Sequence, residues 1–346
     1  MKKSLPRQGC VKAARNVQGA VHKMIQLKKV HKTFPNTAVP AVDEVSFKIE
    51  KGNICVFVGP SGCGKTTILR MINRLVEPTG GSIYIDGENI MDVDGDQLRR
   101  RIGYVIQQIG LLPHRTIEQN IGLVPRLLKW PEDRINKRVK ELMEIVGLDP
   151  QETAWKYPYQ LSGGQMQRAG VARALAVDPP IMLMDEPFGA VDPIVRGRLQ
   201  DEFLRLQQEV KKTICFVTHD INEALKMGDY IVVLNAGKLV QKGTPMEMLS
   251  DPANDFVKDL IGDDRGVKLL DLTRAESLLQ ATTSKTAKTV RECSCYIDAL
   301  QPVKMALEVM MKHNSDMVGI RRGDQVIGTL SWTEIKQHIN KISGDQ

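Results

Sequence analysis

The sequence predicts an α/β fold with a parallel β-sheet at its centre, followed by a smaller α+β unit. Short, apolar, β-rich segments alternate with helical segments through the first 261 residues, and this alternation is typical of a parallel sheet covered by helices. A glycine-rich loop joins one of these strands to a helix. The chain has 346 residues, which is enough for one large domain and one small one.

The expected strands fall into two groups by their pattern of apolar residues. Residues 24–33 and Val42–Glu50 alternate between apolar and polar side chains, as half-buried strands do. The other group is short and rich in apolar or β-branched residues, as suits buried strands: Ile54–Val58, residues 181–184, Thr213–Val217 and residues 230–234. Residues 82–86 predict one more strand. Helices are expected at residues 66–75, 135–146, 165–177 and 196–210.

The pattern changes after residue 261. Residues 263–283 are polar, contain glycine and then become rich in Ala, Ser and Thr, so we expect a linker there. A compact unit follows at residues 284–342. Within it we expect a helix at 303–312, strands at 317–321 and 325–329 joined by a turn at Gly323, and a helix at 333–340. The main domain is thus expected to span residues 24–262.

The net charge of +7 is concentrated at the N-terminus. Residues 1–23 contain six basic side chains and no acidic one, which leaves about +1 for residues 24–346. A body so nearly balanced in charge argues against nucleic acid as a partner. The basic segment lacks the apolar stretch of a secretory signal. We therefore expect residues 1–23 to form a disordered basic extension.

Apolar runs and cysteines limit the environment of the protein. No run approaches the roughly 18 apolar residues that a membrane helix needs, so other chains must span the bilayer if the protein serves a membrane process. The six cysteines have neither the spacing of a disulfide framework nor that of a metal site. Reduced thiols in a cytosolic protein are expected.

The glycine-rich loop has the sequence GPSGCGKT at residues 59–66. It fits the pattern G-x-x-x-x-G-K-[ST] and lies between a buried strand and a helix, which is the context that this phosphate-binding motif requires. Its glycines allow backbone N–H groups to approach phosphate oxygens, and the helix start adds partial positive charge. We expect Lys65 to bind the β- and γ-phosphates and the Thr66 hydroxyl to hold Mg²⁺.

An acidic pair follows the buried strand at residues 181–184. Asp185 at the end of that strand is placed to hold Mg²⁺, directly or through water. Glu186 comes next and is expected to polarise the water that attacks the γ-phosphate. Such a pair is often only a solvated turn, but a phosphate loop in the same chain favours a catalytic role.

A second helix start has the composition of an anion site. Ser162 can cap the helix at residues 165–177, and Gly163 and Gly164 leave its N–H groups accessible. Taken alone, this arrangement is a common structural cap. Its sequence context, LSGGQMQR at residues 161–168, resembles the signature sequence of the ATP-binding cassette (ABC) ATPases.

Four further positions match that family in the family's order. Phe34 lies where the family has an aromatic ring that stacks on adenine, and Gln107 lies in the loop that senses Mg²⁺ and the transmembrane partner. Asp192, in Ala190-Val191-Asp192, resembles the loop that joins two active sites, and His219 matches the switch histidine that contacts the γ-phosphate. The resemblance covers about residues 24–261.

The resemblance implies a P-loop ABC ATPase cassette, with an antiparallel β subdomain and a helical subdomain beside the parallel core. The implied catalytic residues are Glu186, His219 and Gln107, and the implied Mg²⁺ ligands are Thr66, Gln107 and Asp185. The implied ATP contacts are Phe34, Gly59, Pro60, Ser61, Gly62, Cys63, Gly64, Lys65, Thr66 and Thr67. The signature residues Ser162, Gly163, Gly164 and Gln165 would contact the nucleotide of a second copy, so the resemblance implies a homodimer closed over ATP.

Three further segments resemble quaternary-amine importers for glycine betaine, carnitine or choline. They are RRRIGYVIQQIGLLP at residues 99–113, PRLLKWP at 125–131 and FVKDLIGDDRG at 256–266. This resemblance implies integral membrane permease partners, an indirect extracytoplasmic substrate-binding protein, and a peripheral position at the cytoplasmic face of the cell membrane. Residues 284–342 resemble one degenerate repeat of a cystathionine-β-synthase-type (CBS) domain, which is a regulatory module.

Two alternatives remain open at this point. The first is the ATPase subunit of an amino-acid or polyamine importer, because the solute does not contact this subunit. The second is a non-transport ABC ATPase that acts on ribosomes or DNA. The single cassette and the lack of a long coiled-coil insertion both argue against this second alternative.

Overall fold

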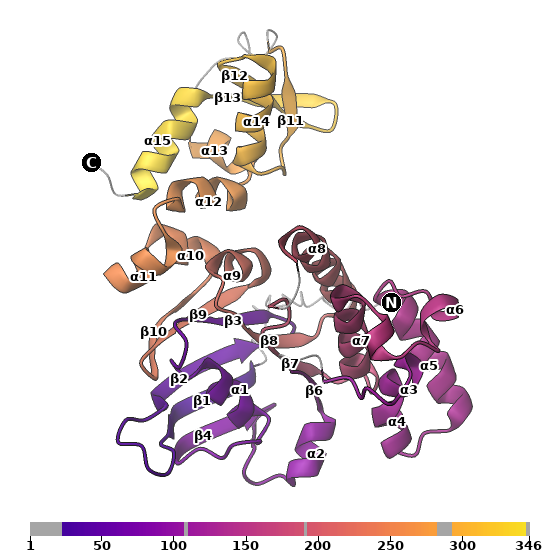
Figure 1. Ribbon diagram of the computed structural model, residues 1–346. Helices are drawn as coiled ribbons and strands as arrows, with labels where there is room; N and C mark the ends of the chain where they lie inside the picture. The colour runs from indigo at the N-terminus through magenta and orange to yellow at the C-terminus, as the bar shows by residue number, and fades with distance from the viewer. Residues whose placement is uncertain (1–22, 107–109, 190–191, 282–292, 344–346) are drawn as a thin grey trace, which may run out of the picture.

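The computed structural model describes residues 23–106, 110–189, 192–281 and 293–343 (Figure 1). Its central sheet has the strand order β10-β9-β3-β8-β7-β6. The neighbours from β9 to β6 pair in parallel, while β10 adds an antiparallel edge. The six strands are β3 (Ile54–Val58), β6 (Ile102–Val105), β7 (Ile181–Asp185), β8 (Thr213–Val217), β9 (Tyr230–Asn235) and β10 (Lys238–Gly243).

The continuously apolar strands lie where the sequence predicts them. All five residues of β3, β7 and β8 are buried, because helices cover both faces of a parallel sheet. Water cannot satisfy their backbone groups, so the ladder between neighbouring strands must do so. The prediction of a parallel core is confirmed.

A second sheet packs beside the first and is antiparallel, with the order β2-β1-β4-β5. Its strands are β1 (Lys23–Lys32), β2 (Val42–Glu50), β4 (Gly80–Ile85) and β5 (Glu88–Asn89). In β2, buried and exposed residues alternate as the sequence predicts. Helix α1 (Lys65–Ile72) shares one hydrophobic core with this sheet and with β3.

A group of helices lies on the other side of the central sheet (Figure 1). It comprises α3 (Ile117–Ile121), α4 (Leu123–Leu127), α5 (Glu132–Ile145), α6 (Pro150–Thr153) and α7 (Gly163–Leu175). Apolar side chains of α3, α5 and α7 join one core with the strands of the parallel sheet. The remaining helices of the main domain are α2 (Gly95–Arg100), α8 (Pro193–Val210), α9 (Ile221–Met227), α10 (Pro245–Ser250) and α11 (Asp255–Ile261).

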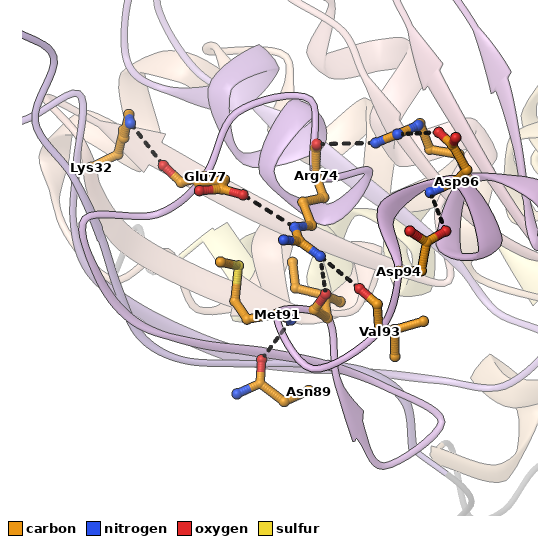
Figure 2. A network of polar contacts seen from close by, with 10 residues as sticks. Lys32, Arg74, Glu77, Asn89, Met91, Val93, Asp94 and Asp96 are labelled. Atoms are coloured by element: carbon orange, nitrogen blue, oxygen red, sulfur yellow. Dashed lines mark hydrogen bonds and ion pairs between the residues drawn. The ribbon is translucent and has the colours of Figure 1, made fainter.

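Arg74, just after α1, fastens the antiparallel sheet to the phosphate-loop helix (Figure 2). Its guanidinium donates hydrogen bonds to the carbonyls of Ile90 at 3.2 Å and Val93 at 2.6 Å, and to the Glu77 carboxylate at 3.2 Å. The Lys32 ammonium donates to the Glu77 carbonyl at 2.7 Å. These contacts connect the end of β1 to the C-terminus of α1.

The segment predicted as a linker, residues 263–283, contains two helices: α12 (Arg265–Leu272) and α13 (Ala275–Ala281). Helix α12 contacts α10 on one side and α14 and α15 on the other. Leu269 belongs to the core of the main domain and Leu270 to the core of the C-terminal unit. The polar, glycine-containing residues before Val267 favoured the prediction of a linker, although the apolar residues of α12 are spaced as in an amphipathic helix.

The C-terminal unit has a three-stranded sheet of order β11-β12-β13, in which β11 and β12 are parallel and β12 and β13 form a hairpin. Its elements are β11 (Tyr296–Asp298), α14 (Val303–His313), β12 (Met317–Arg322), β13 (Gln325–Ser331) and α15 (Trp332–Ser343). They match the helices and the hairpin expected from the sequence. No helix in the described residues is both long and apolar enough to span a bilayer.

Candidate functional site

The phosphate loop connects β3 to α1 through two glycines that no other residue could replace without rearrangement. At Gly59, φ is 146°, and a Cβ atom would lie 2.1 Å from the Leu234 carbonyl oxygen. At Gly64, which caps α1, φ is 101° and a Cβ atom would lie 2.4 Å from the Ala41 carbonyl oxygen. The loop is therefore pressed against β9 and the start of β2, and only glycine permits this approach.

Lys65 places its ammonium group inside this loop. Its Nζ donates hydrogen bonds to the carbonyl oxygens of Gly59 at 2.7 Å and Pro60 at 2.9 Å, and it lies 3.7 Å from the Cys63 sulfur. Only 7% of Lys65 is exposed. A buried ammonium next to the positive end of α1 makes this loop a site for an anion such as phosphate.

Asp185 lies at the end of β7 and faces the first turn of α1. The Thr66 hydroxyl donates a hydrogen bond of 2.9 Å to its carboxylate. Burial raises the pKa of Asp185, while the Thr66 hydrogen bond and the charges of Arg70 and Lys65 lower it in part. The two oxygens are hard ligands and could hold a divalent cation.

Glu186 follows Asp185 and lies beside His219. The Glu186 backbone is left-handed with φ of 47°, and its N–H donates to the Val217 carbonyl at 3.0 Å. His219 Nδ1 is 3.5 Å from Glu186 Oε1, and 63% of the histidine side chain is exposed. A carboxylate and an imidazole at this distance can hold a water molecule and accept its proton.

The structure thus brings together five of the predicted residues at one edge of the central sheet. Lys65 and Thr66 follow β3, Asp185 and Glu186 lie at the end of β7, and His219 follows β8. These three strands pair in parallel, so their carboxyl ends meet. Polar groups from three distant parts of the sequence therefore surround one volume.

Phe34 lies just beyond the end of β1 and is 37% exposed. The Lys32 ammonium lies 5.1 Å from the centre of its ring. An accessible ring face of this kind can stack on a flat base, and the nearby cation strengthens the local preference for an electron-rich ligand. This position agrees with the role that the sequence analysis expects, and no contact with a ligand tests it.

Ser162 caps α7 as the sequence predicts. The Gln165 N–H donates to the Ser162 hydroxyl at 3.3 Å, and the Gln165 side chain accepts from the Ser162 N–H at 3.0 Å. This capping box fixes the first turn of the helix. Ser162 and Gly163 are exposed, so this helix start is accessible to another molecule.

Two further predicted positions are Gln107 and Asp192. Gln107 lies outside the described residues, so its expected roles in catalysis and metal binding stay predictions. Asp192 is exposed just before α8, and its carbonyl accepts a hydrogen bond of 2.8 Å from the Arg196 N–H. Its expected role as the connection between two sites also stays a prediction.

Sequence reasoning missed Arg70 and Tyr104. Both lie close to Asp185: the charge of Arg70 lowers the pKa of Asp185, while burial and the charge of Asp185 raise the pKa of Tyr104. A signal for Arg70 was present, because it lies four residues after Thr66 on the same face of α1. Tyr104 depends on the pairing of β6 with β7, which the sequence alone does not show.

Comparisons with known proteins agree with this geometry. Residues 42–189 match the family model described as ABC transporter. The chain is 55% identical over 260 residues to the glycine betaine/carnitine/choline transport ATP-binding protein OpuCA of Bacillus subtilis, covering 75% of this chain and 68% of that protein. It is 46% identical over 278 residues to the glycine betaine uptake system ATP-binding protein YehX of Escherichia coli, covering 80% of this chain and 89% of that one.

A solved structure is similar as well. It is a dimeric ATP-binding cassette in a post-hydrolysis state, bound to ADP and Pi. The TM-score is 0.58 and the sequence identity is 37%, over 64% of this chain and 99% of that chain.

Replacement of Lys65 tests the phosphate loop directly. We expect Lys65→Ala to weaken nucleoside triphosphate binding by roughly tenfold to a hundredfold, because charge-assisted hydrogen bonds to the phosphates are lost. A fluorescent triphosphate analogue measures the affinity. Lys51→Ala, at an exposed lysine of the turn before β3, is the matched control and should bind normally. Unchanged affinity in Lys65→Ala would contradict this assignment of the site.

Proposed function

Because the chain belongs to the ABC transporter family of ATP-hydrolysing subunits, we propose that two copies of it close over ATP and Mg²⁺ to drive solute import. The proposal depends on one observation above all. Lys65, the Thr66–Asp185 pair and the Glu186–His219 pair converge at a single edge of the parallel sheet. This set contains the groups that phosphoryl transfer to water needs: phosphate ligands, cation ligands and a base.

ATP binding is assigned first to the phosphate loop. The Lys65 ammonium would exchange its two carbonyl partners for β- and γ-phosphate oxygens, and the loop N–H groups would donate to the same phosphates. Phe34 would stack on adenine. Mg²⁺ fits the hard oxygens of Thr66 and Asp185, which lie 2.9 Å apart, with Gln107 as the further expected ligand. When bound, the ion would neutralise charge on the phosphates.

Hydrolysis is assigned to Glu186 with His219. Glu186 would orient a water molecule and accept its proton as the water oxygen bonds to the γ-phosphorus, while the bond to the β-phosphate oxygen breaks. The products are ADP and inorganic phosphate. The exposed His219 side chain, 3.5 Å from Glu186, would donate to a γ-phosphate oxygen and hold it in line.

The second copy would complete the site. Phosphates bound at the loop would leave their outer oxygens uncovered, and the exposed helix start at Ser162 and Gly163 presents the positive end of the α7 dipole. In a head-to-tail pair, each copy would place this turn over the nucleotide of the other. Gly164 and Gln165 belong to the same turn, and Asp192 would lie between the two sites. The dimeric form of the similar cassette supports this arrangement.

Glu186→Gln tests both the base and the dimer. We expect the variant to bind ATP normally, to lose turnover by about a hundredfold or more, and to accumulate as a dimer with ATP, because the amide cannot accept the proton. Phosphate release measures turnover, and light scattering coupled to size-exclusion chromatography measures mass. Glu209→Gln, at an exposed position on α8, is the control. A variant that hydrolyses ATP at the normal rate would exclude Glu186 as the base.

The proposed solute class is that of quaternary ammonium osmoprotectants such as glycine betaine, carnitine and choline. The similar proteins support it, since the one from B. subtilis serves glycine betaine, carnitine and choline transport and the one from E. coli serves glycine betaine uptake. The solute itself would be bound by an extracytoplasmic binding protein and moved by integral membrane permease subunits. This chain would sit on the cytoplasmic face of the membrane and supply the motion.

Reconstitution of the full transporter in liposomes tests the solute class. We expect glycine betaine, choline or carnitine to stimulate ATP hydrolysis several-fold, and arginine to have no effect. The rate of phosphate release with each solute is the measurement, and a complex containing Glu186→Gln gives the background. Stimulation by arginine or by a polyamine alone would favour the amino-acid or polyamine alternative.

The C-terminal unit is proposed as a single CBS-like regulatory module, with the boundaries 284–342 expected from the sequence. Its β11-α14-β12-β13-α15 order supports this proposal, and so does its attachment to the main domain through α12. A unit docked on a helix that belongs to both cores is placed to sense conditions such as ionic strength and to transmit them.

Truncation after α12 tests this regulation. Removal of residues 274–346 should abolish the dependence of uptake on ionic strength and leave ATP hydrolysis at low salt within about twofold of the full chain, because the cassette core remains intact. Uptake of a radiolabelled solute at several salt concentrations is the measurement. An unchanged response to salt in an active truncated protein would refute a sensing role.

A further inference from the structure

Helices α8 and α9 are joined by polar contacts next to two functional loops. Helix α9 begins two residues after His219, with Asp220 as its cap, and α8 begins directly after Asp192. The contacts include an exposed pair, Lys226 with Asp201 at 2.8 Å, and a half-buried pair, Arg196 with Asp220 at 3.8 Å. Between them lies a buried pair that the proposed mechanism does not use.

The buried pair consists of Gln200 on α8 and Glu223 on α9. The Gln200 amide Nε2 donates to Glu223 Oε1 at 3.0 Å. Each residue is only 6% exposed. An ordinary helix contact at this depth would use apolar side chains, since a buried carboxylate is costly unless its hydrogen bonds are satisfied.

Glu223 also reaches the turn that carries His219. The Glu223 N–H donates to Asp220 Oδ1 at 3.4 Å, and the Asp220 N–H donates to the Thr218 hydroxyl at 3.1 Å. Thr218 itself is buried, and its N–H donates to the Phe57 carbonyl at 3.1 Å. Thr218 and Asp220, the residues on both sides of His219, are therefore hydrogen-bonded to each other, and Asp220 is hydrogen-bonded to Glu223.

Several groups shift the pKa of Glu223 in opposite directions. Burial raises its pKa, hydrogen bonds from Thr218 and Gln200 lower it, the Asp220 charge raises it, and the Arg196 charge lowers it. Such a site is stable only while all of its partners keep their places. A displacement of either helix would leave a buried acceptor unsatisfied.

We propose that Glu223 is a positioning residue that, through Gln200 on α8 and through Asp220 and Thr218 beside His219, fixes the His219 turn to α8, so that His219 and Asp192 move together. This inference depends on the proposed function, in which His219 contacts the γ-phosphate and Asp192 lies between two sites. The buried pair then gives the histidine of one site a fixed relation to the loop that contacts the other. Nucleotide binding by Lys65 does not depend on the Gln200–Glu223 pair.

An exchange of the two side chains tests the proposal in the full-length protein. Gln200→Glu alone places two buried carboxylates against each other and should lower kcat by roughly tenfold to a hundredfold, because the His219 turn is displaced. The KM for ATP should change by less than about threefold, since the phosphate loop is untouched. Adding Glu223→Gln restores one donor facing one acceptor between the helices, and it should return kcat to within about threefold of the wild type.

Controls separate positioning from stability and from failure of the overall function. Asp201→Asn removes the neighbouring exposed ion pair between the same helices and should leave kcat unchanged. The thermal midpoint and the ATP affinity are measured for every variant. The proposal is overturned if Gln200→Glu keeps normal kcat, if kcat and ATP affinity fall together with the midpoint, or if the folded double variant stays inactive. Normal turnover in Glu186→Gln would instead overturn the proposed function.

Discussion

The parallel pairing of β3, β7 and β8 is the constraint on which the site depends. Because these strands run in the same direction, their carboxyl ends meet at one edge, and whatever follows each strand is brought within a few ångströms of the others. More than a hundred residues separate Lys65 from Asp185 in the sequence, yet both lie with His219 at this one edge of the sheet. Burial of all three strands makes this register rigid, since a slip would leave ladder groups without partners in the interior.

The sequence predicted those parts of the site that are encoded locally. A loop of fixed glycine spacing, the acidic pair after an apolar strand and the Ser162 cap each fit within a few residues, and the structure has the Thr66–Asp185 contact and the cap in the expected places. Contacts between distant elements were missed. Tyr104 reaches Asp185 only through the pairing of β6 with β7, and Glu223 meets Gln200 only because α9 packs on α8. Helix α12 was missed because the polar, glycine-containing stretch at residues 262–266 favoured a linker. Gln107 lies outside the described residues, so its expected role is untested.

Asp185 and Glu223 are both buried carboxyl groups. Both carry the free-energy cost of burying a charge, but they serve different roles. Burial raises the pKa of both, and in both a threonine hydroxyl compensates in part. Asp185 faces the phosphate loop, where a bound cation would stabilise its ionised form further. Glu223 faces only the protein, so its hydrogen bonds act on the arrangement of helices. A raised pKa alone therefore does not identify a catalytic group, and the direction in which the carboxylate points decides between the two roles.

Helix α12 has a mechanical consequence. Successive residues on a helix point about 100° apart. Leu269 and Leu270 therefore pack into two different hydrophobic cores from one short helix. Helix α12 cannot rotate about its own axis without opening a void in one of these cores, and voids in packed interiors are strongly unfavourable. A movement of the main domain that displaces α12 is therefore expected to displace α14 and α15 as well, because both helices contact α12 (Figure 1).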